Sequence, residues 1–251
     1  MCLFLRTNKG VELTEAGRSL YQQSQHMFQN FRMMVDSVRD VDAGVRGLLK
    51  VGVVYSNTPV VLNYLKAYHK EYPQVELYIR VGAPGDLLDD LNRGDLHVLF
   101  LRTPTEGSSD FHEKILGEDP LELVMCPELD PAPDQDSIPI ELLKDVPMCL
   151  LRSDDLWGYS SHLINECQRK GFTPNTVCQC YDTPMTMQLV QAGFGISYLP
   201  RSIVETHPGS NIYSKPLVGL PAKSYPTLLW SSNIYYANCV KRFISMFGYP
   251  T

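Results

Sequence analysis

The sequence lacks the features that mark membrane and secreted proteins. Among its 251 residues, no apolar run approaches the roughly 18 residues of a membrane-spanning helix. The start, Met1 to Leu5, does not combine a basic leader with a sustained apolar stretch. We therefore expect no secretory signal, no membrane partner and a cytoplasmic protein.

Motifs of catalysis and metal binding are also missing. The chain has no nucleophile elbow, no recognisable pair of catalytic carboxylates and no Gly-rich dinucleotide fingerprint. Its histidines are scattered, and its seven cysteines form neither a CxxC pair nor a zinc spacing. We expect no enzyme, no metal, no cofactor and reduced thiols.

Positive charge is scarce outside the amino-terminal fifth. The net charge is −6 at pH 7, yet the first 50 residues hold seven Lys/Arg against five Asp/Glu. An acidic body does not present a nucleic-acid surface. Any DNA contact must lie near the amino terminus, where Arg6 and Lys9 flank a predicted β-hairpin turn and could weakly approach phosphates, unless that turn is simply solvated.

The chain does contain a regular alternation of predicted β-strands and α-helices. The run from Leu48 to Tyr55 is rich in β-branched residues, Ser56 to Pro59 carries helix-start signals, and Val75 to Val81 alternates apolar and polar residues. The segment from Leu48 to Gly82 is therefore predicted to be one βαβ unit. The strand predicted at 96–101 follows a helix at 86–92 and adds a second crossover.

The same alternation resumes after the polar segment 105–110, which we expect to be the first crossing into a second lobe. That lobe is predicted to begin with strands at 111–117 and 121–126 and to continue with helices and strands to about residue 200. The chain returns through 217–233, and an amphipathic helix at 237–247 packs back on the first lobe. The fold class is α/β with two lobes.

The ends of these predicted strands carry a candidate binding site. Ligands of parallel α/β sheets bind beyond the carboxyl ends of the strands, where helix amino termini offer free amide donors. The candidate effector-binding residues are Ser56, Asn57, Thr58, Ala83, Arg102, Thr103, Thr183, Pro184 and Thr186.

Each group in this site has a plain structural alternative. Ser56 and Thr58 have the residue types that cap helices, so helix capping alone would explain them. Arg102 follows a strand directly and could clamp a carboxylate or phosphate, but it could equally form a salt bridge at the surface or at the hinge between lobes.

A long helix is predicted to follow Thr14. Its apolar positions step alternately by four and three residues, interrupted only by Ser24, and form one narrow stripe that favours dimerisation over packing on the chain's own body. Gly44 and Gly47 end the pattern. The stripe consists of Leu20, Met27, Phe31, Met34, Val38 and Val41.

Several blocks resemble LysR-type transcriptional regulators. The stretch LFLRTNKGVELTEAG at 3–17 is similar to the end of that family's winged helix-turn-helix and the start of its linker helix. Gly94-Asp95-Leu96 and VQAGFGISYLP at 190–200 are similar to its effector domain. The resemblance implies a two-lobed type 2 periplasmic-binding-protein-like effector domain preceded by a linker helix, with an effector pocket to which the region around Thr183 contributes.

The resemblance also divides the chain. It implies a wing remnant at 1–13, a linker and dimerisation helix at 14–46, a first lobe from 47–103 and 227–251, and a second lobe from 104–226. The chain begins just ahead of the wing, so we expect promoter DNA to be a partner only of full-length relatives. His97 stands where relatives usually have Asp, and we interpret it as a strand residue.

Three functions remain open at this stage. The first is a ligand sensor, a homodimer or homotetramer that binds a small and preferably anionic effector to control DNA-dependent transcription. The second is a redox switch through second-lobe cysteines such as Cys167 and Cys178, against which stands their interpretation as core thiols. The third is a stand-alone small-molecule-binding protein without DNA binding.

Overall fold

The computed structural model describes residues 2–7, 10–41, 46–103, 111–152, 159–206, 211–220, 223–232 and 234–249. Lys9 lies outside these ranges, and of Thr103, Val38 and Val41 only the backbone is described. No helix in the described part is long and apolar enough to cross a membrane.

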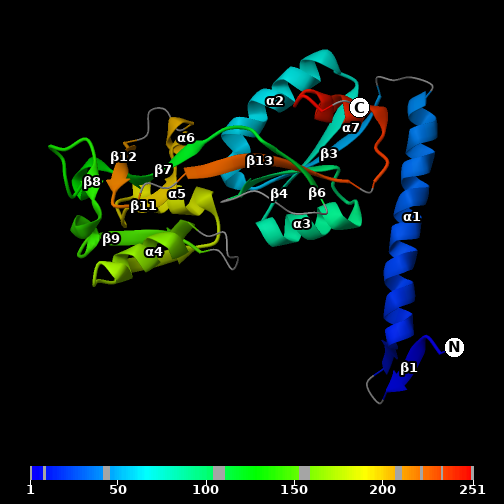
Figure 1. The fold of residues 1–251 in the computed structure, drawn as a ribbon, viewed down its shortest axis with the longest axis horizontal. Coiled ribbons are helices and arrows are strands. Elements are labelled where there is room, and N and C mark those ends of the chain that lie inside the picture. Colours follow the sequence, from blue (N-terminus) through cyan, green and yellow to red (C-terminus); the bar gives the residue numbers. More distant parts are fainter. Residues whose placement is uncertain are drawn as a thin grey trace.

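The amino-terminal part is a β-hairpin followed by one long helix. Strands β1 (Phe4–Thr7) and β2 (Gly10–Leu13) pair antiparallel, as predicted, and α1 spans Glu15–Val41. The Thr14 hydroxyl caps the helix by accepting a hydrogen bond from the Gly17 amide at 2.9 Å. Figure 1 shows α1 standing beside the rest of the molecule with the hairpin at its far end.

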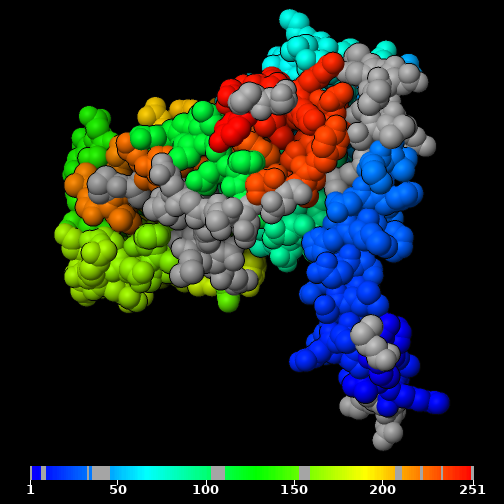
Figure 2. Space-filling view, turned by 45° about the vertical axis from the view of Figure 1, so that its right-hand side comes forward, coloured from blue at the N-terminus to red at the C-terminus, as the bar shows by residue number. Residues whose placement is uncertain are grey.

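The face of α1 that meets the chain's own body is polar. Gln25 and Gln29 are half-buried, and Gln29 lies next to Gly94 at the end of α3. At about 100° per residue, the predicted apolar stripe lies on the opposite side. Its described members are exposed, as are neighbouring apolar side chains: Leu20, Tyr21, Met27, Phe28, Phe31, Met34 and Val35. The apolar stripe is therefore not buried by the chain itself, and Figure 2 shows much of α1 projecting beyond the body.

One half of the body is built on the predicted βαβ unit. Strands β3 (Gly47–Val53), β4 (Val75–Val81) and β5 (Val98–Thr103) are parallel, in the order β4-β3-β5. Helices α2 (Thr58–Glu71) and α7 (Asn238–Ser245) cover one face, and α3 (Pro84–Arg93) covers the other. The packing confirms the predicted return of the carboxyl-terminal helix to this half.

Aromatic rings organise the core under α2 and α7. Phe243 is fully buried and contacts Tyr68 and Phe100 edge to face, with ring centroids 5.2 and 6.1 Å apart. The Tyr68 hydroxyl donates to the Cys239 carbonyl at 2.7 Å. Val61, Leu65 and Tyr68 form the buried face of α2, whereas the Leu62 side chain lies off this face and is 56 % exposed.

One strand takes part in the sheets of both halves. Strand β13 (Lys223–Ser231) pairs with β5 and with β6 (Phe111–Ile115), both antiparallel. Its first residues, Lys223 and Ser224, pair instead with the start of β7 (Asp119–Met125). In Figure 1, β13 runs across the molecule from one half to the other.

The location of β6 corrects a prediction. The sequence places a strand at 111–117 in the second lobe, but β6 pairs with Thr227–Ser231 and so extends the sheet of the first half. The polar segment expected to cross between lobes, 105–110, falls outside the described residues. The described chain instead passes into the second half between Ile115 and Asp119, directly after β6.

Strand β7 is the central strand of the sheet in the second half. Strands β11 (Ser197–Pro200) and β12 (Tyr213–Val218) flank β7 antiparallel, and the short β8 (Ile138–Pro139) pairs with β12. Two further strands, β9 (Pro147–Leu151) and β10 (Asn175–Cys180), form a parallel pair. The helices here are α4 (Tyr159–Arg169), α5 (Thr183–Gln191) and α6 (Arg201–Glu205). Three short 3₁₀ helices complete the described elements: η1 (Tyr55–Asn57), η2 (Pro127–Leu129) and η3 (Ile140–Leu143).

His97 holds two strands of the first half together. Its backbone amide donates to the Lys50 carbonyl at 2.9 Å, and its Nδ1 accepts from the Lys50 amide at 3.1 Å. Burial and the nearby Lys50 charge lower the pKa of His97 to about 4. The neutral ring is an acceptor in the fold, so it is a structural residue, as the sequence suggests.

The lowered pKa of His97 predicts that the folded protein loses stability in acid. Between the unfolded pKa of about 6.5 and the folded pKa of about 4, the unfolded chain binds a proton that the folded chain excludes. The free energy of unfolding should therefore fall by about 3 kcal/mol as pH drops through this window. His97→Asn, which keeps an acceptor but does not titrate, should flatten the loss in urea titrations at pH 7 and pH 4.5. The control His69→Asn, at an exposed position, should leave the loss of stability between these two pH values unchanged. If His97→Asn and the parent protein lost the same free energy of unfolding between pH 7 and pH 4.5, the assignment would be contradicted.

Candidate functional site

A cavity of about 650 Å³ opens between the two halves. The first half contributes the ends of β3 and β4, the start of α3 and Arg102 of β5. The second half contributes the end of β9, the start of α4 and the start of α5. The lining residues are Val54, Tyr55, Ser56, Val81, Gly82, Ala83, Pro84, Gly85, Asp86, Arg102, Leu151, Arg152, Tyr159, Tyr181, Asp182, Thr183 and Pro184.

Two helix amino termini face this cavity. Helix α3 begins at Pro84 after the N-cap residue Ala83, and no side chain caps it, so the amides of Gly85 and Asp86 have no partner within the helix. Helix α5 is capped by Asp182, whose Oδ1 accepts from the Met185 amide at 2.7 Å. The start of α5 carries the predicted residues Thr183 and Pro184. In the first half the helix-start signals were predicted at Ser56–Pro59, at the start of α2, whereas the terminus that faces the cavity is that of α3, which is the better anion-binding end.

The structure separates the candidate residues into two groups. Ser56, Ala83, Arg102, Thr183 and Pro184 line the cavity. Those that do not line it are Asn57, Thr58 and Thr186, and the side chain of Thr103 lies outside the described part of the structure. The Thr186 hydroxyl points into α5, donating to the Asp182 carbonyl at 2.8 Å.

The start of α2 also differs from the simple capping alternative. The N-cap residue of α2 is Asn57, and no side chain makes the cap hydrogen bond. Its amide Nδ2 instead donates to the Leu101 carbonyl at 2.6 Å, while its buried Oδ1 has no hydrogen-bond partner. Helix capping therefore does not explain why Ser56 and Thr58 stand in this loop.

Arg102 is the centre of a buried polar cluster between the halves. Nε and Nη2 donate to the Ser56 carbonyl at 3.0 and 2.6 Å, and Nη2 also donates to the Ser202 hydroxyl at 3.1 Å. Nη1 donates to the Ser224 hydroxyl at 2.8 Å and pairs with Asp119 Oδ2 at 2.7 Å. All five N–H groups thus have partners, so the hinge salt bridge is what the structure shows. An anion clamp at Arg102 would require this ion pair to open.

Asp119 is fixed from the second half. Its Oδ2 accepts from the Ser202 hydroxyl at 2.5 Å and its Oδ1 from the Ser202 amide at 3.2 Å. Tyr159 lies against the same cluster, and burial raises the pKa of its phenol to about 12 although Arg102 and hydrogen bonds with Ser224 and Ser56 lower it. At neutral pH the polar side chains of this cluster are therefore held in fixed positions by their hydrogen bonds and by the ion pair between Arg102 and Asp119.

Sequence reasoning missed most of the second-half wall. Arg152 was not a candidate, yet it lines the cavity with its guanidinium 5.5 Å from the centre of the Tyr181 ring. Tyr159 adds aromatic surface to the same wall, and the first half contributes two further residues that were not candidates, the ring of Tyr55 and the carboxylate of Asp86. Arg152 directly follows β9, and Arg102 directly follows the strand predicted at 96–101, so a cation at a strand end was the signal that could have identified Arg152.

Comparison with known proteins identifies the family. The model of the LysR substrate binding domain matches residues 42–248. The chain belongs to the LysR family.

Curated relatives and solved structures agree with this assignment. The HTH-type transcriptional regulator BsdA of Bacillus subtilis is 25 % identical over 239 residues, covering 95 % of this chain and 82 % of BsdA. BudR of Raoultella terrigena is 25 % identical over 247 residues, which cover 98 % of this chain and 84 % of BudR. The crystal structure of CbnR, a LysR family transcriptional regulator, has a TM-score of 0.70 at 18 % identity and covers 94 % of this chain and 81 % of CbnR. The two-lobed fold and the effector-binding domain predicted from sequence are confirmed.

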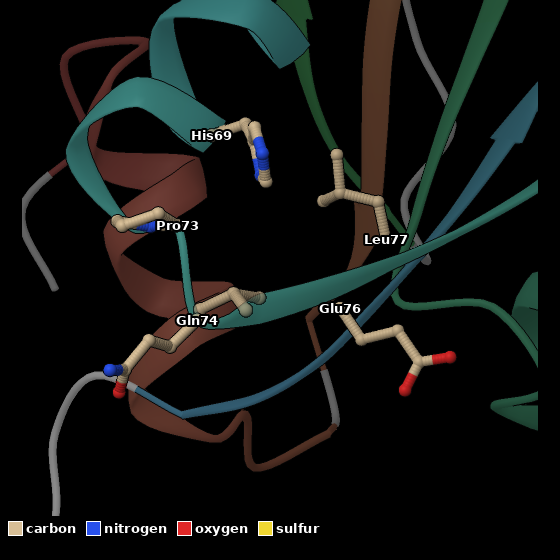
Figure 3. A pocket seen from close by; sticks show the side chains of 6 residues that line it. His69, Pro73, Gln74, Glu76 and Leu77 are labelled. Atoms are coloured by element: carbon tan, nitrogen blue, oxygen red, sulfur yellow. The ribbon is translucent and has the colours of Figure 1, made fainter.

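Another pocket of this LysR-family chain lies where α2 ends and β4 begins. Its lining residues are His69, Pro73, Gln74, Val75, Glu76 and Leu77. Figure 3 shows the Glu76 carboxylate turned away from the His69 ring, so the two do not form a ligand pair. This pocket is not a candidate effector site because only one half contributes to it.

The second-half cysteines of the LysR effector domain occupy both faces of the β9–β10 pair. Cys167 packs in the core with Met148 and Leu150, whereas Cys178 stands opposite Cys149 in register, on the alternate face. Burial raises the pKa of both Cys149 and Cys167 to about 11. A direct Cys167–Cys178 disulfide does not fit this arrangement, which favours core thiols.

Proposed function

We propose that this chain is the effector-sensing and dimerisation part of a LysR-type transcriptional regulator, which binds a small anion in the cavity between its halves to control DNA-dependent transcription. The observation that carries the proposal is the cavity itself, because both halves line it. A ligand shifts the arrangement of the halves only if it binds one arrangement better. A molecule in contact with both walls meets that condition.

The walls favour an anion over a cation. The uncapped amino terminus of α3 presents amide donors and a positive dipole end, and Arg152 contributes a cation from the facing wall. Asp182 is occupied as a cap, which leaves Asp86 as the opposing carboxylate. Structures of the same fold have been solved for the CcmR regulatory domain with 2-PG and for the QuiR effector domain with shikimate.

The candidate residues take two roles in this proposal. Ser56, Ala83, Thr183 and Pro184 form the ligand-facing surface, with Arg152 as an added contact. The supporting residues are Asn57, Thr58, Arg102, Thr103 and Thr186, which hold the loops and the hinge.

The remaining assignments follow the family. We propose a homodimer or homotetramer formed through α1, a cytoplasmic location, and promoter DNA as a partner bound through the helix-turn-helix that full-length relatives carry. Arg6 adds at most a weak phosphate contact. The division at 1–13, 14–46, 47–103 with 227–251, and 104–226 remains our proposal, except that β6 joins the first lobe. No observation favours catalysis over binding.

A ligand screen tests the proposal. Thermal shift over small carboxylates, aromatic acids and phosphates should reveal a compound that raises the melting temperature, because a ligand of the folded state stabilises it. Arg152→Gln should weaken that compound's binding at least tenfold by calorimetry, since a charge-assisted contact contributes about 1.5 to 3 kcal/mol.

The control is Arg169→Gln, which removes the same charge from an exposed site on α4 outside the cavity. It should leave the affinity unchanged. Equal loss in both variants, or binding that survives Arg152→Gln intact, would place the anion elsewhere.

A further inference from the structure

Two thiols of β10 lie within reach of one bridging atom. Cys178 and Cys180 are two residues apart on the same face of the strand, and their Sγ atoms are 3.8 Å apart. The pairing of β10 with β9 shifts register between Thr176 and Cys178, and after the shift Cys178 stands opposite Cys149 of β9. Because side chains alternate along a strand, Cys178 and Cys180 share one face.

The spacing suits a bridging atom better than a disulfide. Residues two apart in a strand have Cα atoms about 6.6 Å apart, near the upper end of the range for disulfides. A disulfide would also require the two sulfurs to approach to about 2.05 Å. One soft atom bonded to both at about 2.3 Å, as in zinc thiolates, spans sulfurs up to about 4.6 Å apart. The observed 3.8 Å falls within that span.

The surroundings favour a ligand that needs only two sulfurs. Within the described residues, no three His, Cys, Asp or Glu side chains are placed to hold a metal ion. Cys178 is half-buried, which leaves one side of the pair open, and Cys180 is 7 % exposed. Burial raises the pKa of the Cys180 thiol, so that thiol keeps its proton at neutral pH.

We propose that Cys178 and Cys180 form a two-thiol site for trivalent arsenic compounds. An organic arsenic oxide, R–As=O, condenses with both thiols to give R–As(S–Cys178)(S–Cys180) and one water molecule. Two As–S bonds form, the As=O bond and two S–H bonds break, and both protons leave in the water. Arsenic stays trivalent, so no oxidant or reductant is needed.

The test uses the purified full chain and phenylarsine oxide. After washing with an excess of a monothiol, the parent protein should retain one equivalent, because a two-sulfur chelate outcompetes single thiols by about a hundredfold or more. A dithiol should remove it. Mass spectrometry of peptides should locate the adduct on the segment that carries Cys178 and Cys180.

Matched variants separate this pair from the other cysteines. Cys178→Ala and Cys180→Ala should each lose the monothiol-resistant adduct, whereas Cys167→Ala, a buried thiol in the same half, should retain it. Retention by either of the first two variants would overturn the proposal, as would an adduct mapped to another cysteine of the parent protein. The assay contains no effector, so a negative result here can be told apart from a failure of the proposed effector binding in the cavity.

Discussion

Arg102→Met should lower the free energy of unfolding by about 3 to 5 kcal/mol, because it leaves the buried Asp119 carboxylate without its counter-charge. The side chains of this ion pair are 2 % and 9 % exposed, so water cannot replace the lost partner. The carbonyl of Ser56 also loses its two donors. Urea unfolding at pH 7 measures the change.

Two further variants test the cause. Lys223→Met removes an ion pair with Glu118 whose side chains are both more than half exposed, and it should cost less than about 1 kcal/mol. Combining Arg102→Met with Asp119→Leu should recover a large part of the loss, since an apolar pair carries no uncompensated charge. A double variant as unstable as Arg102→Met alone would show that the lost hydrogen bonds, and not the buried charge, dominate.

Met27→Glu with Phe31→Glu should dissociate the oligomer. Both side chains are about 60 % exposed on the apolar face of α1, at 61 % and 59 %. If this face is covered by a second copy, each protomer would bury two carboxylates, at several kcal/mol per ion. Since 1.4 kcal/mol is a factor of ten, the dissociation constant should rise by about a thousandfold or more. Sedimentation equilibrium or light scattering measures it.

The matched control is Gln22→Glu, which adds charge to an exposed position away from the apolar stripe. It should leave the mass unchanged. A parent protein that is monomeric at micromolar concentration would remove the basis for the dimerisation role of α1, and would favour a stand-alone binding protein.

Local signals in the sequence predicted local structure well. The Thr14 cap formed at the predicted helix start, because it needs only a hydroxyl within three residues of an amide. The βαβ unit from β3 to β4 also follows from nearest-neighbour patterns. These elements required no knowledge of distant partners.

Contacts between distant residues limited the prediction. Arg102 was a candidate ligand because its partners Asp119, Ser202 and Ser224, up to 122 residues away, cannot be read from its own neighbourhood. Strand β6 was assigned to the wrong half because its partner β13 is more than a hundred residues later. The Asn57 side chain similarly donates its hydrogen bond to the Leu101 carbonyl, 44 residues away. Helix α2 therefore has no side-chain cap, although the residues at its start are of capping types.

Strand β13 restricts how the two halves can move. Since it is hydrogen-bonded to β7 at Ser224 and to β5 from Tyr225 onward, a continuous ribbon crosses the boundary. The halves cannot slide past each other as independent bodies without rupturing that ribbon. Closure must therefore bend or twist the chain at its two described crossings, next to Ser224 in β13 and between Ile115 and Asp119, and the hydrogen bonds that β13 makes on both sides of the boundary limit how far the halves can close.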